Sequence, residues 1–441
     1  MTELLQRKHY LDEFKRFRDS AQKGAAARLF PVRQAAISRF AEIGFPPRKD
    51  EEWKYTDVAP IAAIPFVQFP EVTSGSVGEL LAQHRVPGLE GPLLVFLDGV
   101  FQPEVSKIRT LPQGVRIGNL AVALEEYPEE VEPLVRVPEE AQAFSALNTA
   151  FFRHGAFIQL PPSAVLTDPV QLVFLSSGQT GEAAAYYRNL IVAGANSQAT
   201  FVEVYGGAGE TPYLTNVVTD VRVGANANID HYKLQQEALQ AFHISLLEVH
   251  MEASSRYRNH FSSLGGGLVR NEIVSTLDAE GCDCTLNGLF HADGDRHVDN
   301  HTTLNHAKPH CNSWEVYRGI LNDRAHGIFS GKIVVYKDAQ KTDAKQSNSN
   351  LLLSPNADAT TRPRLEIYAD DVRCTHGATV GQLDKDALFY LRSRGIPLQE
   401  ARNLLTRGFA SEVINEISVE PLREHVEQLF MERLARGGNC S

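Results

Sequence analysis

The chain has 441 residues, of which 43% are hydrophobic and 22% are charged, which is typical of a globular protein with a large core. Its formal net charge of −11 repels a phosphate backbone, and no basic block with interleaved aromatic residues occurs. No apolar run is long enough to span a bilayer, so we expect neither nucleic acid nor a membrane as a partner.

The N-terminus lacks the basic-then-apolar order of a secretory signal, which predicts a cytoplasmic protein. An odd number of cysteines in a large chain argues against a disulfide framework. We therefore expect free or metal-bound thiols in a reducing compartment. The five residues are Cys282, Cys284, Cys311, Cys374 and Cys440.

Residues 1–150 read as an N-terminal region of helical and mixed structure. Residues 1–45 are predicted to be helical, and Pro46-Pro47 stops the second helix. A short strand follows at 92–97, and an acidic helical stretch at about 119–150. The apolar stripes of the first two helices are Tyr10, Leu11, Phe14 and Phe17, then Ile37, Phe40, Ala41 and Ile43.

Residues 151–384 consist of short β runs, and one sequence pattern occurs in them four times. Each version is an apolar strand that ends in a turn residue plus alanine and is followed by a second strand. The turn alanines, Ala195, Ala225, Ala253 and Ala279, are 30, 28 and 26 residues apart. A two-strand unit of this kind cannot bury its face alone, so the repeat predicts stacked rungs, a parallel β-helix. A β-sandwich is the rival architecture, but hairpin signals are scarce.

Residues 385–441 are predicted to form a C-terminal helical domain of four segments, with Gly395 and Gly408 at helix ends. The segments are 387–394, 397–406, 411–418 and 421–436. Their apolar stripes indicate a small bundle, which either packs on itself or docks a partner.

The strongest chemical signal is Cys374-x-His376, on a short segment between acids and glycines. Strand side chains alternate between faces, so an extended segment places both side chains on one side. The pair then serves either as soft-metal ligands or as a nucleophile and its base.

Other motifs carry weaker signals. The histidines between 291 and 310, with Cys311, lack metal-ligand spacing and are predicted to be structural; they are His291, His297, His301, His306 and His310. Cys282-x-Cys284 reads as buried thiols rather than as a soft-metal pair. Gly327–Lys332 is one residue too short for a phosphate loop, and Asp370-Asp371 project to opposite faces.

Several stretches resemble the SufB/SufD family of iron–sulfur cluster assembly scaffold proteins. The match covers nearly the whole chain and is most specific from about 300 to 410. The stretches are Glu51–Thr56, Asn300–Ser313, Tyr317–Leu321, Asp338–Ala344, Gln346–Ser354, Arg364–Gly381 and Phe389–Pro397.

The resemblance implies a right-handed parallel β-helix core between helical regions and a role as a non-enzymatic, cytoplasmic scaffold. It implies pairing with a SufB subunit through the end of the β-helix and docking of the ATPase SufC through the C-terminal helices; a homodimer is a further option. Cys374 and His376 would then bind a transient, nascent iron–sulfur cluster, and the chain would need no nucleotide site.

Glu51–Thr56, the Pro309–Ser313 run and the lack of an N-terminal Cys-x-x-Cys favour the SufD branch. A SufB-type paralogue with the same role is the first alternative. A β-helix enzyme that acts on polysaccharide is the second, and a structural adaptor in which Cys374 and His376 only pack is the third.

Overall fold

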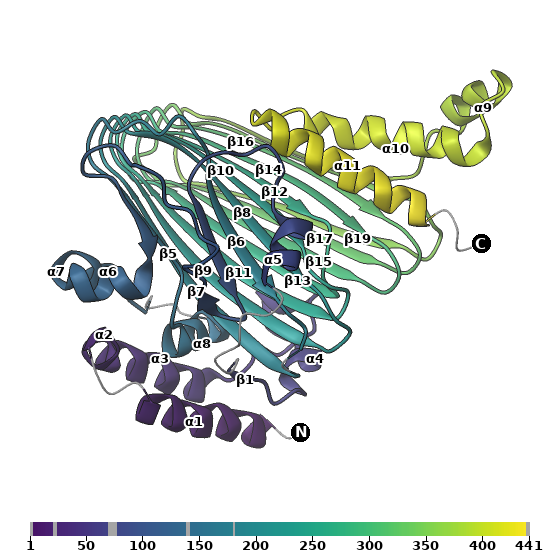
Figure 1. The fold of residues 1–441 in the computed structure, drawn as a ribbon. Coiled ribbons are helices and arrows are strands. Elements are labelled where there is room, and N and C mark those ends of the chain that lie inside the picture. The colour runs from purple at the N-terminus through teal and green to yellow at the C-terminus, as the bar shows by residue number, and fades with distance from the viewer. Residues whose placement is uncertain (1–2, 21–23, 69–76, 138–141, 180, 438–441) are drawn as a thin grey trace.

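The structure, a computed structural model, describes residues 3–20, 24–68, 77–137, 142–179 and 181–437. Its centre is a β-solenoid of about 8 turns, and helices lie towards both ends of the chain (Figure 1). The mainly β fold with a parallel β-helix core and flanking helices is thereby confirmed, and the β-sandwich is excluded.

The N-terminal region contains helices that bury the predicted apolar stripes. Tyr10, Phe14 and Phe17 are buried on the first helix, and Ile37 and Phe40 on the third. The helical elements are α1 (Glu3–Ser20), α2 (Gly24–Arg28), α3 (Phe30–Ile43), η1 (Glu51–Trp53), α4 (Ala59–Ala62), α5 (Val77–His84), α6 (Leu120–Glu126), α7 (Pro128–Val131), η2 (Glu132–Leu134) and α8 (Ala143–Phe151).

Two sheets of stacked strands form the solenoid. The strands are β1 (Val67–Gln68), β2 (Leu93–Leu97), β3 (Val100–Phe101), β4 (Arg116–Asn119), β5 (Ala156–Leu160), β6 (Val170–Ser176), β7 (Ala183–Ala193), β8 (Gln198–Gly207), β9 (Tyr213–Val223), β10 (Asn228–Gln236), β11 (Ala241–Met251), β12 (Arg256–Ser263), β13 (Leu268–Leu277), β14 (Asp283–Ala292), β15 (His297–His306), β16 (Asn312–Leu321), β17 (His326–Val335), β18 (Asp343–Leu352), β19 (Asp358–Ile367) and β20 (Arg373–Gly381).

Odd-numbered strands from β5 to β19 pair in parallel within one sheet, and even-numbered strands from β6 to β20 pair in parallel within the other. The N-terminal region adds strands to both sheets: β4 pairs with β5, and β2 pairs with β6. Between residues 152 and 384 the described residues form strands and turns but no helix, as the sequence predicts.

In the six turns between β7 and β18 that lead from an odd-numbered to an even-numbered strand, a left-handed residue lies two positions before the even strand starts. Asparagine and glycine reach this conformation at little steric cost, which accounts for the repeated turn phrase. The same device recurs in two later turns that the sequence analysis did not recognise. The residues are Asn196 (φ 60°), Asn226 (57°), Ser254 (55°), Gly281 (77°), His310 (59°) and Lys341 (64°).

Inward-facing apolar side chains from both sheets fill much of the solenoid, in one large cluster and a smaller one around Phe290. The Phe174 ring stacks between the rings of Phe96 and Tyr205, at centroid distances of 4.9 and 4.8 Å. Each rung therefore buries its apolar surface against its neighbours, which is the main stabilising contribution in a solenoid.

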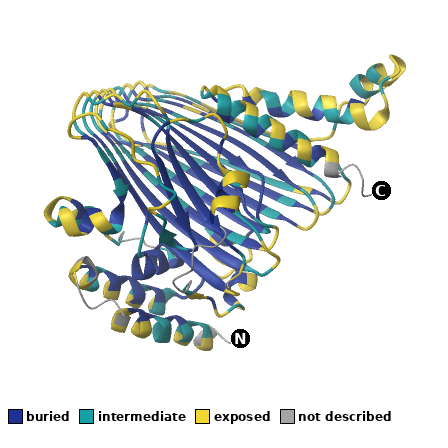
Figure 2. Ribbon diagram, in the orientation of Figure 1, coloured by how far each residue is buried: buried dark blue, intermediate teal, exposed yellow. Residues whose placement is uncertain are grey.

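Helices cover the outer faces of both sheets. Helices α1, α3 and α8 pack over the early strands of the odd-numbered sheet. Helices α5, α10 and α11 cover the even-numbered sheet (Figure 1). Most solenoid strands are dark blue in Figure 2, whereas yellow gathers in the turns, on outward helix faces and on α9. None of the described helices is long and apolar enough to cross a bilayer.

The C-terminal region forms three helices in the described chain rather than the four predicted segments: α9 (Lys385–Ser393), α10 (Leu398–Ile414) and α11 (Glu420–Gly437). The segments predicted at 397–406 and 411–418 are one helix, and Gly408 lies inside it. A helical glycine costs about 1 kcal/mol relative to alanine. Ala410 and Val413, both fully buried against the even-numbered sheet, offset that cost.

Candidate functional site

Cys374 and His376 lie on β20, the last strand of the even-numbered sheet. The β18–β20 register places Cys374 beside Ala344 and His376 beside Gln346. Ala344 and Gln346 are buried, and paired residues of a parallel ladder point to the same face. Both candidate residues therefore face the interior at the end of the solenoid, as expected for a Cys-x-His pair on a strand.

The two side chains differ in exposure. Cys374 is half-buried and packs against the apolar core, and this burial raises the pKa of its thiol, with a smaller effect from Asp343. His376 is exposed. A protonated thiol is a poor nucleophile at neutral pH, so this environment disfavours the nucleophile-and-base reading of the pair.

The donor set suits a soft metal centre but is incomplete. Thiolate and imidazole both bind the irons of iron–sulfur clusters, and such irons take four ligands in total. In the described part of the chain no three His, Cys, Asp or Glu side chains gather around one point. A metal site built on Cys374 and His376 would therefore need donors from elsewhere.

The solenoid ends differently at its two termini. At the N-terminal end, the five residues of β2 are buried and β3 and β4 close the sheets with antiparallel pairs. At the other end, β19 and β20 are edge strands with no buried residue. Ile367, Tyr368 and Val380 are 40%, 62% and 43% exposed there. We call this surface, formed by β19 and β20, the open end.

A polar pair lies one rung below His376. Gln346 is 3% exposed, and its Nε2 donates to Oε2 of Glu315 at 2.5 Å. Burial raises the pKa of Glu315 from 4.5 to about 7, which outweighs the opposite effect of its hydrogen bonds. A Cβ atom added to Gly331 would lie 2.2 Å from Gln346 Nε2, so the amide occupies space that only glycine leaves free.

The six residues from His291 to Cys311 do not come together, which agrees with their structural interpretation. His291 packs against Phe430 of α11, and His306 bonds Ser313 inside the solenoid at 2.9 Å. Burial lowers the pKa of His291 to about 3 and that of His306 to about 4. His310 is an exposed turn residue. The other two histidines, His297 and His301, lie on the outer face of β15.

The remaining cysteines are buried small side chains rather than an exposed site. Cys282, Cys284 and Cys311 are fully buried, and all three thiols are free. Cys282 and Cys311 occupy successive turns and bond the same carbonyl oxygen, that of Ala279, each at 3.2 Å. Cys440 lies outside the described residues.

The other weak motifs are structural as well. Gly327–Lys332 lies within strand β17, so it does not form the loop before a helix that phosphate binding needs. Asp371 pairs with Lys341 of the neighbouring turn, and this fixes the turn that leads into β20.

The sequence analysis missed a strap that crosses the outer face of the odd-numbered sheet. In this strap, residues 51–56, Glu51 pairs with Arg362 of β19, and Glu52 pairs with Arg364 of β19 at 3.0 Å. Glu52 also lies 3.4 Å from His301 of β15. The hydrogen bond to His301, followed by that to Arg364, lowers the pKa of Glu52 to about 2. The strap thus ties an edge strand of the open end to the N-terminal region.

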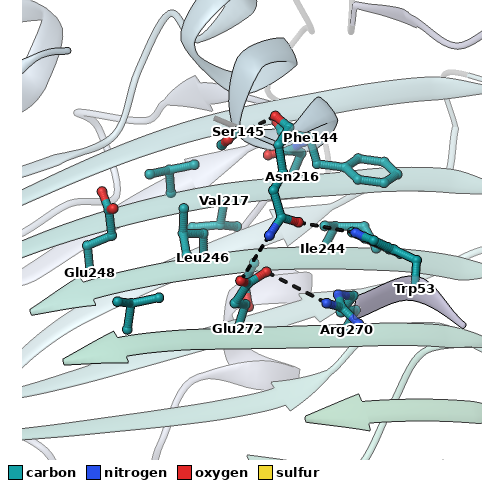
Figure 3. A pocket seen from close by; sticks show the side chains of 14 residues that line it. Trp53, Phe144, Ser145, Asn216, Val217, Ile244, Leu246, Glu248, Arg270 and Glu272 are labelled. Atoms are coloured by element: carbon teal, nitrogen blue, oxygen red, sulfur yellow. Dashed lines mark hydrogen bonds and ion pairs between the residues drawn. The ribbon is translucent and has the colours of Figure 1, made fainter. Parts of the chain in front are cut away.

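A cavity of about 420 Å³ lies where this strap and α8 meet β9, β11 and β13 (Figure 3). Trp53 Nε1 donates to Gln142 Oε1, and Gln142 Nε2 donates to Glu272 Oε1, both at 3.2 Å. Arg270 lies 3.8 Å from Glu272, and its guanidinium stacks on Trp53. The polar side chains of this cavity mostly bind one another. Their contacts connect Trp53 of the strap to Arg270 and Glu272 of β13.

Charged residues that the sequence analysis also missed lie inside the early rungs. Lys233 Nζ lies 2.8 Å from His243 Nε2 and 3.0 Å from Asn271 Oδ1, and burial lowers its pKa to about 8. His243 contacts Glu237 at 2.7 Å. Charged residues on strands usually face solvent. The one sequence signal of this cluster is that Lys233 occupies an inward position in the inward–outward alternation of its strand.

The C-terminal helices have a buried and an exposed surface. Phe430 of α11 is fully buried against the even-numbered sheet. Phe389 and Tyr390 of α9 are 75% and 58% exposed, on a helix that projects beyond the rest of the bundle (Figure 1). Exposed aromatic pairs of this kind mark protein interaction surfaces.

Two family models match the chain: "SUF system FeS cluster assembly, SufBD core domain" over residues 174–409 and "SufBD protein N-terminal region" over residues 5–172. An iron–sulfur cluster assembly SufBD family protein of Synechocystis is 32% identical, covering 91% of this chain and 90% of its own. Escherichia coli SufD, an iron–sulfur cluster assembly protein, is 30% identical over 92% and 93% of the two chains. The chloroplastic protein ABCI7 of Arabidopsis thaliana is 28% identical over 93% and 88%.

Proposed function

Because this chain belongs to the SufBD family of iron–sulfur cluster assembly proteins, we propose that it is the SufD-type scaffold subunit of a cytoplasmic assembly complex. In this proposal the open end pairs with a SufB-type subunit, and α9 docks the ATPase SufC. Cys374 and His376 contribute to the site at which the nascent cluster, the cargo of the complex, is built.

The open end carries this proposal. An edge strand presents unpaired backbone N–H and C=O groups, which natural proteins normally cover or disrupt. Here both edge strands are uncovered, and apolar Ile367, Tyr368 and Val380 border them. A second solenoid with the same rung spacing would satisfy these groups and cover the apolar side chains.

The chemistry of the pair suits an interface site. Burial raises the pKa of the Cys374 thiol, so the free subunit holds it protonated and unreactive. Binding of a soft metal centre releases that proton and supplies the stabilisation that the buried thiolate otherwise lacks. His376 offers a ring nitrogen beside it, and the partner would complete the ligand set.

The surface of α9 supports the docking of the ATPase. Phe389 and Tyr390 are 75% and 58% exposed, and the ring of Tyr390 contacts Arg394 of the same segment, whereas α10 and α11 are fixed on the even-numbered sheet. Large exposed aromatic residues are typical anchors of protein interfaces.

Co-expression with SufB-type and SufC-type subunits tests the cluster role. We expect His376→Ala to lower the iron and sulfide content of the anaerobically purified complex without changing its subunit ratio. Thr375→Ala is the matched control, since Thr375 lies between Cys374 and His376 but on the opposite face of β20. Unchanged iron and sulfide in the His376→Ala complex would refute the ligand role.

The docking surface is tested in the same complex. We expect Phe389→Ala to lose the SufC-type subunit and keep the SufB-type subunit. Leu239→Ala is the control, because Leu239 is 62% exposed and lies in the β10–β11 loop, away from α9. Full retention of the ATPase by the Phe389→Ala variant would exclude α9 as the docking element. If the chain assembles with a SufD-type partner instead, it has the role of the SufB-type paralogue.

A further inference from the structure

Gln346 occupies a constrained position directly below His376. The two residues are register partners on β18 and β20, and Gln346 is buried inside the solenoid. Its amide nitrogen donates to Glu315, and the same nitrogen lies over Gly331 on the opposite sheet. The side chain is therefore held at both sides of the solenoid interior and has little freedom to move.

One atom of this amide lacks a partner. Gln346 Oε1 is buried and accepts no hydrogen bond within the chain. A buried acceptor left unsatisfied costs about 1–3 kcal/mol, so native proteins rarely retain one without a reason. Of the two register partners of Gln346, Glu315 on β16 and His376 on β20, His376 is the one whose side chain can donate from an imidazole N–H.

We propose that Gln346 is a positioning residue for His376: its side-chain oxygen accepts the N–H of one imidazole nitrogen and leaves the other free for the metal. This inference rests on the proposed ligand role of His376. Metal-binding histidines generally donate their second ring N–H to an oxygen acceptor, which fixes both the tautomer and the ring orientation.

Glu315 sets the direction of the amide. Above its pKa of about 7, the Glu315 carboxylate is ionised and only accepts hydrogen bonds, so it selects the orientation in which the Gln346 NH₂ group faces it. The Gln346 oxygen is then on the side away from Glu315. Glu315 thus acts on His376 only through Gln346 and never touches the metal.

The tautomer of His376 gives a readout that does not depend on cluster assembly. In ¹⁵N-histidine-labelled protein, the two ring nitrogens of a neutral imidazole have separate resonances, and His376→Ala assigns those of His376. The spectra are recorded at about pH 8.5, roughly two units above the pKa of the model histidine side chain. We expect one tautomer to exceed the other by about tenfold in the wild type, the ratio that one net hydrogen bond supports.

Gln346→Met keeps the length of the side chain and removes the acceptor. We expect it to bring the tautomer ratio of His376 close to that of free imidazole and to weaken iron(II) binding by the complex by about 10- to 100-fold. Asn348→Leu is the matched control, because Asn348 is a buried amide on the same strand whose register partner is Ala378. Asn348→Leu should leave the His376 tautomer unchanged.

The outcomes separate the two proposals. An unchanged tautomer ratio in Gln346→Met would overturn the positioning role, whatever the cluster content. A changed ratio together with normal iron and sulfide in His376→Ala would support the hydrogen bond and refute the proposed ligand role. If Gln346→Met fails to fold, Glu315→Met removes the fixed acceptor of the amide instead, and an unchanged tautomer there would equally overturn the proposal.

Discussion

Replacing Glu315 with glutamine removes a carboxyl whose ionisation the folded protein resists. Burial raises the pKa of Glu315 from 4.5 to about 7. The folded protein therefore keeps a proton that the unfolded chain has already released, and stability falls as the pH rises from about 4.5 to about 7. This linkage lowers the free energy of unfolding by about 1 kcal/mol at pH 5 and about 3 kcal/mol at pH 8.

Glu315→Gln keeps an oxygen for the Gln346 amide but has no proton to lose. Relative to the wild type, we expect the variant to gain about 2–3 kcal/mol between pH 5 and pH 8. Urea unfolding at both pH values measures this gain through the fluorescence of Trp314, the neighbouring residue on β16, which is 36% exposed. Glu280→Gln, on an exposed turn, is the control. A difference between Glu315→Gln and wild type that is the same at both pH values would refute the reasoning.

Glu52→Gln should destabilise the protein by about 1 kcal/mol at pH 6, after solvent screening, and by almost nothing at pH 2. The pKa of Glu52 is lowered to about 2, so its carboxylate stabilises the fold above pH 4.5, and this stabilisation is lost as the pH falls. Equal shifts of the melting temperature at both pH values would contradict this reasoning. Phe430→Ala should cost about 3–5 kcal/mol in urea unfolding, against less than about 0.5 for exposed Phe389→Ala. Gly331→Ala should lower the free energy of unfolding by about 1–3 kcal/mol, because the added Cβ would overlap the Gln346 amide. The double variant with Gln346→Ala should recover part of this stability, and no recovery would show that the overlap is not the cause.

The solenoid was predictable because its turns carry a local signal. The left-handed residue after Ala195 and Ala225 is asparagine, a residue that tolerates this backbone, so the same short phrase recurs at each rung. Later turns place His310 and Lys341 there, and neither repeats the asparagine of the early turns. The sequence analysis therefore recognised the early rungs directly and reached the later ones through the family resemblance.

Features that depend on long-range packing were not predictable from local patterns. Gly408 reads as a helix end, yet contacts of Ala410 with the even-numbered sheet keep the helix continuous. Lys233 reads as a surface residue, and its burial depends on partners from neighbouring rungs. The spacing of Cys374 and His376 gave their shared face correctly, but the polar layer below them requires the register of β18 and β20.

The different ends of the solenoid limit the stoichiometry of any assembly built on them. A solenoid with two exposed ends could add copies head to tail without limit and form fibres. Within the described residues the short antiparallel strands β3 and β4 end the two sheets on one side, so the long parallel edges lie at β19 and β20. Two chains that join through β19 and β20 cover these edges in each other, which favours an assembly that stops at a pair of solenoids.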